Sequence, residues 1–137
     1  MLLKGGKLKK MVNPKELLKP TCYSQAVRAG KFLFISGQIS QDAEGKFIHK
    51  GDFEKQVRQV FENIQSVLKA EKGSLEDVVK ITEYVTKNAA DEKILNKYIE
   101  VHAEFFKKHL PASTFVQVKS LISKDLLIEI DAVAVLK

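Results

Sequence analysis

The sequence predicts an α+β fold in which two amphipathic helices cover one face of a mixed sheet. Two segments carry apolar residues at helical spacing, and strand-like runs precede, separate and follow them. The resulting order is β-β-α-β-α-β-β, which is typical of a two-layer domain. A chain of 137 residues is long enough for one such core. We therefore expect a single domain over residues 11–137.

Two extended runs open this domain, at residues 25–28 and 32–39, and a short strand is expected near residues 11–12. Residues 32–35 are apolar without a break, which predicts burial on both faces of the strand. Ser36, Gly37 and Gln38 follow directly. Gly37 marks either a bulge at which Ser36 and Gln38 satisfy neighbouring backbone, or the polar wall of a binding site.

Two helices are predicted at residues 52–71 and 91–108. Asp52 is a suitable N-cap for the first, and Gly73 suits a left-handed position after its end. The second ends before Leu110-Pro111. The apolar stripes of the two helices comprise Phe53, Val57, Val60, Phe61, Ile64 and Leu68 in the first, and Ile94, Leu95, Tyr98, Val101, His102, Phe105 and Phe106 in the second.

Three more strands are predicted at residues 78–85, 112–119 and 126–136. In the strand at residues 78–85, apolar and polar side chains alternate imperfectly. The face that holds Ile81 also holds Glu83, so this face is mixed in polarity. The last strand is apolar on both sides apart from Glu129 and Asp131. Helices that cover one face would leave the other apolar face exposed, which predicts an obligate oligomer.

The positive charge is concentrated at the N-terminus. Residues 1–20 hold six Lys and one Glu, so they carry +5 of the net +6. We expect residues 1–10 to be a flexible basic segment, and a nucleic acid is not the expected partner. No apolar run is long enough to span a membrane and no signal-peptide core is visible, so a cytoplasmic location is expected.

Glu129 is the candidate catalytic residue. It lies in the middle of an apolar strand, where desolvation raises the pKa of a carboxyl group unless the group is paired. Such a group can orient water or exchange a proton with a substrate. A place at a strand edge or in an intersubunit ion pair is the structural alternative. The single cysteine, Cys22, and the absence of a Cys/His cluster or phosphate loop predict neither a metal nor another cofactor.

Several short segments, taken together and in order, resemble one known family. They are Tyr23-Ser-Gln-Ala-Val27, Phe34-Ile-Ser-Gly-Gln-Ile39, Val78-Val-Lys-Ile-Thr82, His102-Ala-Glu-Phe-Phe106, Leu110-Pro-Ala112 and Ile128-Glu-Ile-Asp-Ala-Val-Ala134. The sequence resembles the RidA/YjgF family, also labelled endoribonuclease L-PSP or translation initiation inhibitor. The resemblance implies a chorismate-mutase-like fold and a homotrimer with a central β-barrel. It also implies small-metabolite clefts between subunits and cofactor-free hydrolysis of enamines and imines.

The resemblance assigns residues to this cleft one at a time. Tyr23, Ser36 and Gly37 match its substrate-binding wall, and Glu129 matches the carboxylate that helps place the attacking water. The family's clamping arginine is replaced by Ser113, and a small residue nearby is replaced by Phe115. Further departures lie on the second helix, where Ile99 replaces an asparagine and His102 replaces a tyrosine.

Loss of the arginine predicts a changed ligand. A hydrogen bond to a charged group contributes about 1.5–3 kcal/mol, so binding of an α-imino acid should weaken about tenfold or more. Backbone groups of Ser113, Thr114 and Phe115 would then replace the clamp. The expected function is a Rid-like deaminase with altered or reduced activity; the alternatives are a non-catalytic ligand-binding trimer and an RNA-acting protein.

Overall fold

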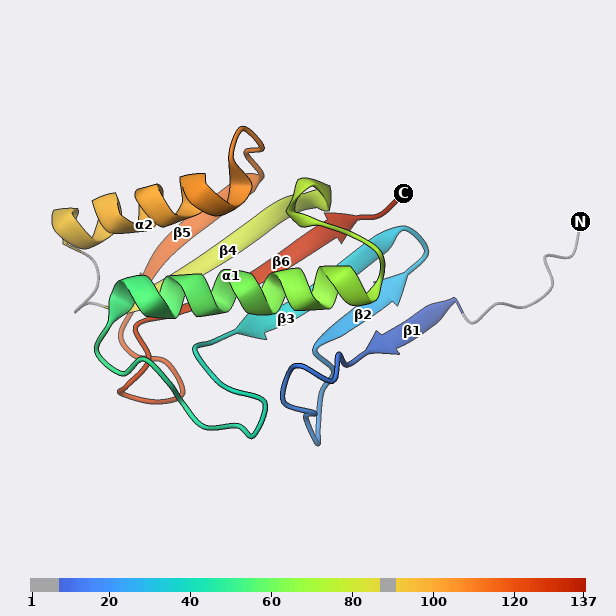
Figure 1. The fold of residues 1–137 in the computed structure, drawn as a ribbon, viewed down its shortest axis with the longest axis horizontal. Coiled ribbons are helices and arrows are strands. Elements are labelled where there is room, and N and C mark those ends of the chain that lie inside the picture. The colour runs from blue at the N-terminus through green and yellow to red at the C-terminus, as the bar shows by residue number, and fades with distance from the viewer. Residues whose placement is uncertain (1–7, 87–90) are drawn as a thin grey trace, which may run out of the picture.

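The computed structural model describes residues 8–86 and 91–137, and it places six strands and two long helices in the order expected (Figure 1). The elements are β1 Lys9–Val12, β2 Ala26–Ala29, β3 Phe32–Gln38, α1 Phe53–Ala70, the 3-10 turn η1 Leu75–Asp77, β4 Val78–Thr86, α2 Glu92–Phe106, β5 Ala112–Val118 and β6 Ile128–Val135.

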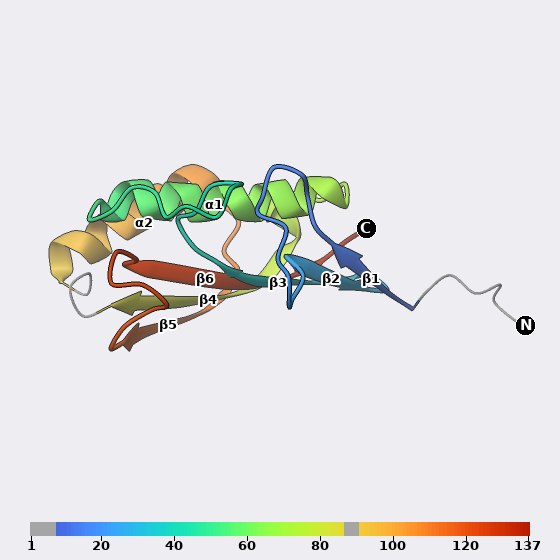
Figure 2. The ribbon, with the colours of Figure 1, turned by 90° about the horizontal axis from the view of Figure 1, so that it is seen from below.

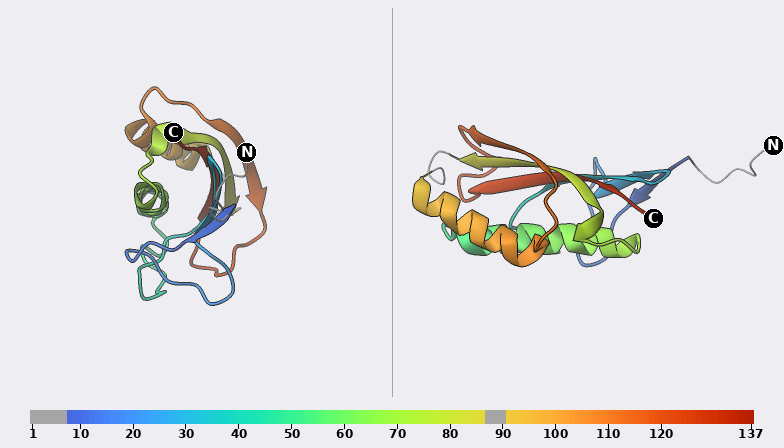
Figure 3. Two further views of the ribbon diagram at one scale, coloured as in Figure 1. Left: turned by 90° about the vertical axis from the view of Figure 1, so that its right-hand side faces the viewer. Right: turned by 90° about the horizontal axis from the view of Figure 1, so that it is seen from above.

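The strands form one mixed sheet in the order β1-β2-β3-β6-β4-β5. Only the β4–β5 pair is parallel among the strand pairs described. Figures 2 and 3 show α1 and α2 together on one side of the sheet. The predicted α+β architecture with both helices on one face is therefore confirmed.

Helix α1 begins as predicted and ends differently. The Asp52 side chain accepts a hydrogen bond of 3.0 Å from the Lys55 N–H. The prediction for Gly73 was wrong, because Lys72 takes the left-handed conformation with φ 59°. Gly73 is needed for close packing instead, since a Cβ there would lie 2.7 Å from Leu136 Cδ2.

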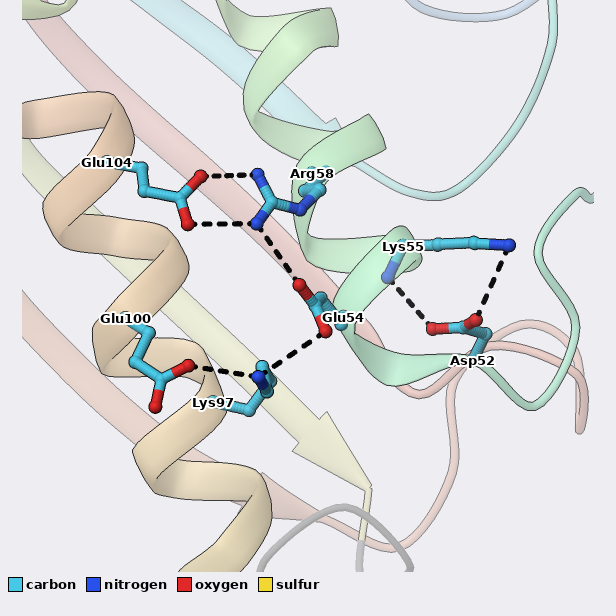
Figure 4. A network of polar contacts seen from close by, with 7 residues as sticks. All are labelled: Asp52, Glu54, Lys55, Arg58, Lys97, Glu100 and Glu104. Atoms are coloured by element: carbon cyan, nitrogen blue, oxygen red, sulfur yellow. Dashed lines mark hydrogen bonds and ion pairs between the residues drawn. The ribbon is translucent and has the colours of Figure 1, made fainter.

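The apolar stripes of the helices meet the sheet and each other around Phe61, which is fully buried. Its ring lies 5.3 Å from the rings of Phe105 and Phe106, measured between centroids. Charged side chains join the exposed faces of the helices (Figure 4). Arg58 binds Glu104 at 2.6 Å, so an ion pair joins α1 to α2.

The sheet face opposite the helices is apolar and exposed. Burial of residues 32–35 on both faces is wrong for the single chain, because Phe32 and Phe34 are each 50% exposed while Leu33 and Ile35 are buried. The two helices cover only the other face. Phe32 pairs with Val135 and Phe34 with Val133, so these four side chains lie side by side.

The N-terminal boundary also needs correction. Strand β1 begins at Lys9, inside the segment of residues 1–10 that was expected to be flexible. Lys10 pairs with Arg28 in the sheet, and both side chains bind Glu71, at 2.7 and 2.9 Å. These contacts hold Lys10 in the sheet, where Lys9 pairs with Ala29. Residues 1–7 lie outside the described part of the chain.

Candidate functional site

A bulge ends strand β3 and shapes the site. Ile35 pairs with Ala132, but Gln38 pairs with Ile130, so three steps on β3 match two on β6. The carboxyl group of Glu129 lies against the backbone of Gly37. A Cβ at Gly37 would lie 2.9 Å from Glu129 Cδ, so a side chain at this position would displace the carboxylate.

Hydrogen bonds fix the polar residues after the bulge. The Ser36 hydroxyl donates to the Ser24 carbonyl at 2.6 Å. The buried Gln38 amide donates to Gln25 Oε1 at 2.9 Å, and Gln25 in turn donates to the Leu18 carbonyl at 2.7 Å. The bulge and the satisfied polar groups are thus confirmed. Gln25 was not singled out from the sequence, although it follows Tyr23 and Ser24 in the motif.

The same residues also line a cavity of about 400 Å³. Tyr23 lies at this cavity and is 52% exposed. The polar and charged part of the wall comprises Tyr23, Gln25, Ser36, Gln38, Gln41, Asp42, Asn63 and Glu129, with Gly37 between them. One chain therefore brings together Tyr23, Ser36, Gly37 and Glu129, which lie on three separate segments of the sequence.

Glu129 is half-buried, and its carboxylate can still accept hydrogen bonds. In the described parts of the chain, no hydrogen bond to this carboxylate is found. Burial raises the pKa of Glu129, and the negative charge of Asp131 raises it further. Asp131 is held by the Tyr84 hydroxyl, which donates to it at 3.0 Å. Glu129 is thus a carboxylate with open acceptor positions at a cavity wall.

Ser113, Thr114 and Phe115 lie elsewhere in the same chain. They are exposed on β5, the outer strand at the opposite edge of the sheet from β1. Ser113 pairs with the buried Ile81, and Phe115 packs on Tyr98 with ring centroids 5.3 Å apart, so both side chains face α2. They are absent from the wall of the Glu129 cavity.

A second buried carboxylate, Glu83 on β4, was not selected from the sequence. It is 1% exposed, and its Oε1 accepts hydrogen bonds from the Tyr98 hydroxyl at 2.7 Å and the Ser113 hydroxyl at 3.0 Å. Burial raises the pKa of Glu83, and these hydrogen bonds act in the opposite direction. Its place among the apolar residues of an alternating strand was the signal in the sequence.

Comparison with known proteins identifies the family. The model of the family described as Endoribonuclease L-PSP matches residues 15–136. The chain belongs to this family, which is the RidA/YjgF family.

Relatives and solved structures agree with this assignment. A RutC family protein of Pyrococcus horikoshii is 48% identical over 112 residues, which cover 82% of this chain and 85% of that protein. The 3-aminoacrylate deaminase RutC of Acinetobacter baylyi is 34% identical over 128 residues, covering 88% and 98%. The structure of RidA from an Antarctic Psychrobacter bacterium superposes with a TM-score of 0.80 at 31% identity, over 93% of this chain and 99% of that one.

The helices that the structure describes are too short or too polar to cross a membrane. Family membership fixes the fold and the general character of the chain.

Proposed function

We propose that this RidA-family protein forms a homotrimer, binds a small metabolite in clefts between subunits, and hydrolyses imines or enamines there. One observation carries the proposal. A half-buried carboxylate, Glu129, lies with open acceptor positions at a cavity whose wall also holds Tyr23 and Ser36. A relative of this chain is a 3-aminoacrylate deaminase by name, which is the same class of reaction.

The chemistry assigned to Glu129 is the placement and activation of water. An enamine first becomes its imine when its carbon gains a proton and its nitrogen loses one. Glu129 then accepts a proton from water as the water oxygen bonds to the imine carbon, and the C=N electron pair moves to nitrogen, which is protonated. In the resulting carbinolamine the hydroxyl proton passes to nitrogen, the C–N bond breaks to release ammonia, and the C–O bond becomes C=O. The product is a keto compound, and no group beyond water is consumed.

The intersubunit cleft is supported by two exposed surfaces. Phe32, Phe34, Val133 and Val135 form an apolar patch on the uncovered sheet face, of the kind that association between copies buries. Strand β5 offers a free edge with exposed Ser113 and Phe115. In the proposed trimer, Ser113 and Phe115 of one subunit close the Glu129 cavity of the next.

The proposed ligand depends less on a carboxylate than the family's α-imino acids do. Ser113 supplies no cation where the resemblance expects an arginine, and Phe115 adds an apolar wall. We therefore expect slow turnover of 2-aminoacrylate and faster turnover of imines that lack a carboxylate.

Generation of 2-aminoacrylate in solution, with pyruvate release as the readout, tests this proposal. Glu129→Gln should abolish the release, while Ser113→Arg should increase it about tenfold by restoring a charge-assisted contact. The mass in analytical ultracentrifugation should be that of three chains. Rapid turnover that is unchanged by Ser113→Arg would contradict the altered ligand. Turnover that survives Glu129→Gln would contradict the site.

A further inference from the structure

Ser113, which replaces the family's clamping arginine, is hydrogen-bonded to the buried carboxylate of Glu83. Ser113 Oγ lies 3.0 Å from both Oε1 and Oε2 of Glu83. The Tyr98 hydroxyl donates to Glu83 Oε1 at 2.7 Å. Glu83 is 1% exposed, so its carboxylate contacts a ligand only through Ser113.

These contacts determine where the hydroxyl protons lie. An ionised carboxylate only accepts hydrogen bonds, so both Ser113 and Tyr98 must donate to Glu83. The Ser113 hydroxyl has a single proton, and this bond uses it. On its exposed side the Ser113 oxygen therefore offers lone pairs alone. An arginine at this position would offer only donors.

The nearest cation does not reverse this polarity. Lys80 lies next to Ile81, and its ammonium group donates to the Ile81 carbonyl and to Thr114 Oγ1, each at 2.8 Å. Thr114 and Lys80 lie on the sheet face opposite to Ser113, because successive residues of a strand alternate between faces. The negative charge of Glu83 therefore dominates the electrostatic potential around Ser113 on the side that faces α2.

We propose that Glu83 sets the ligand preference of the cleft by making Ser113 a hydrogen-bond acceptor. This side of the cleft then selects an N–H group of an amide, amine or iminium and disfavours a carboxylate. The inference rests on the proposed function, which places Ser113 against the ligand. The ring of Phe115, two residues on and on the same face, supplies an apolar surface beside this acceptor.

A matched pair of probes tests the inference. Pyruvate and pyruvamide differ by one oxygen replaced with NH₂, and their Kd values can be measured by NMR titration of the full chain at pH 8. Wild type should prefer pyruvamide. In Glu83→Gln, the new amide donates to Ser113 and releases the hydroxyl proton toward the ligand. The Kd ratio should then shift toward pyruvate by about tenfold.

Glu62→Gln is the control, because it removes the same charge from an exposed position of α1. Its Kd ratio should equal that of wild type. Preference of wild type for pyruvate, or an unchanged ratio in Glu83→Gln, would overturn the inference while leaving the proposed reaction at Glu129 intact. If neither probe binds wild type, the proposed function fails, and the inference fails with it.

Ser113→Ala keeps the test decisive if Glu83→Gln does not fold. This variant retains the bond between Tyr98 and Glu83, and it removes the outward acceptor together with the Ser113 bond to Glu83. It should lose the preference for pyruvamide, whereas Ser113→Thr should retain it. A preference that persists in Ser113→Ala would overturn the proposal.

Discussion

Glu129 and Glu83 lie on adjacent strands in similarly apolar sequence, yet they have opposite surroundings. Glu129 faces the sheet surface away from the helices, lies at a cavity, and receives no hydrogen bond from the described residues. Glu83 faces the helices, is 1% exposed, and receives hydrogen bonds from Tyr98 and Ser113. Burial raises the pKa of both carboxyl groups. A shifted pKa alone therefore does not distinguish a group available for chemistry from one that is structurally satisfied.

The largest expected effect is on turnover at Glu129. Glu129→Gln should lower pyruvate release from 2-aminoacrylate by about 100-fold or more, because the amide cannot accept a proton from water. The free energy of unfolding should change by less than about 0.5 kcal/mol, since no hydrogen bond is lost. Urea denaturation measures this change in the free energy of unfolding. A variant that loses stability and activity together would assign Glu129 to the structure.

At Glu83 we expect a large effect on the stability of the fold. Glu83→Ala should lower the free energy of unfolding by about 2–4 kcal/mol, because it leaves a cavity and strands the Tyr98 hydroxyl without an acceptor. Tyr98→Phe should cost less, about 1–2 kcal/mol, because the Ser113 hydroxyl still donates to the carboxylate. Urea denaturation at pH 7 measures both. Full stability of Glu83→Ala would remove the distinction between the two carboxylates.

The pH dependence of turnover should report the pKa of Glu129. Glu129 must be ionised to accept a proton, and burial and Asp131 raise its pKa. Activity should therefore fall with decreasing pH at an inflection above the ordinary carboxyl value of about 4.3. Asp131→Asn removes a repelling charge, so it should move the inflection to lower pH. An inflection that stays in place would mean that Asp131 does not act on the reacting group.

The smallest effect is expected on the outer surface of the helices (Figure 4). Arg58 binds both Glu54 and Glu104, and Lys97 binds Glu54 and Glu100. These groups are solvated, so Glu104→Gln should lower the melting temperature only slightly, and less in high salt. A loss comparable with that of Glu83→Ala would show that this network, not the buried acid, holds α2 in place.

Local patterns predicted most of the fold. The helical spacing and Asp52 located α1, and the glycine of the Ser-Gly-Gln segment located the bulge. Contacts between residues that are distant in the sequence were harder to predict. Gly73 was assigned to a left-handed position after α1, because a close contact with the distant Leu136 cannot be read from the local sequence. Phe32 and Phe34 were expected to be buried, because an apolar run does not reveal whether its cover comes from the same chain.

The candidate site was predictable only in part for the same reason. Tyr23, Ser36, Gly37 and Glu129 carried a motif or an unusual setting, and the structure brings them to one cavity. The Glu83 contact with Ser113 spans 30 positions. A lone acid in a mixed strand predicts neither its partners nor its degree of burial.

A residue-by-residue NMR titration of the wild-type protein with pyruvamide tests the central claim most directly. Gly37 and Ser113 belong to different parts of the sheet in one chain, and the proposed trimer brings them together in one cleft between two subunits. The amide signals of both residues should shift along binding curves with a single Kd. Shifts at only one of them, or two different Kd values, would contradict a shared intersubunit cleft.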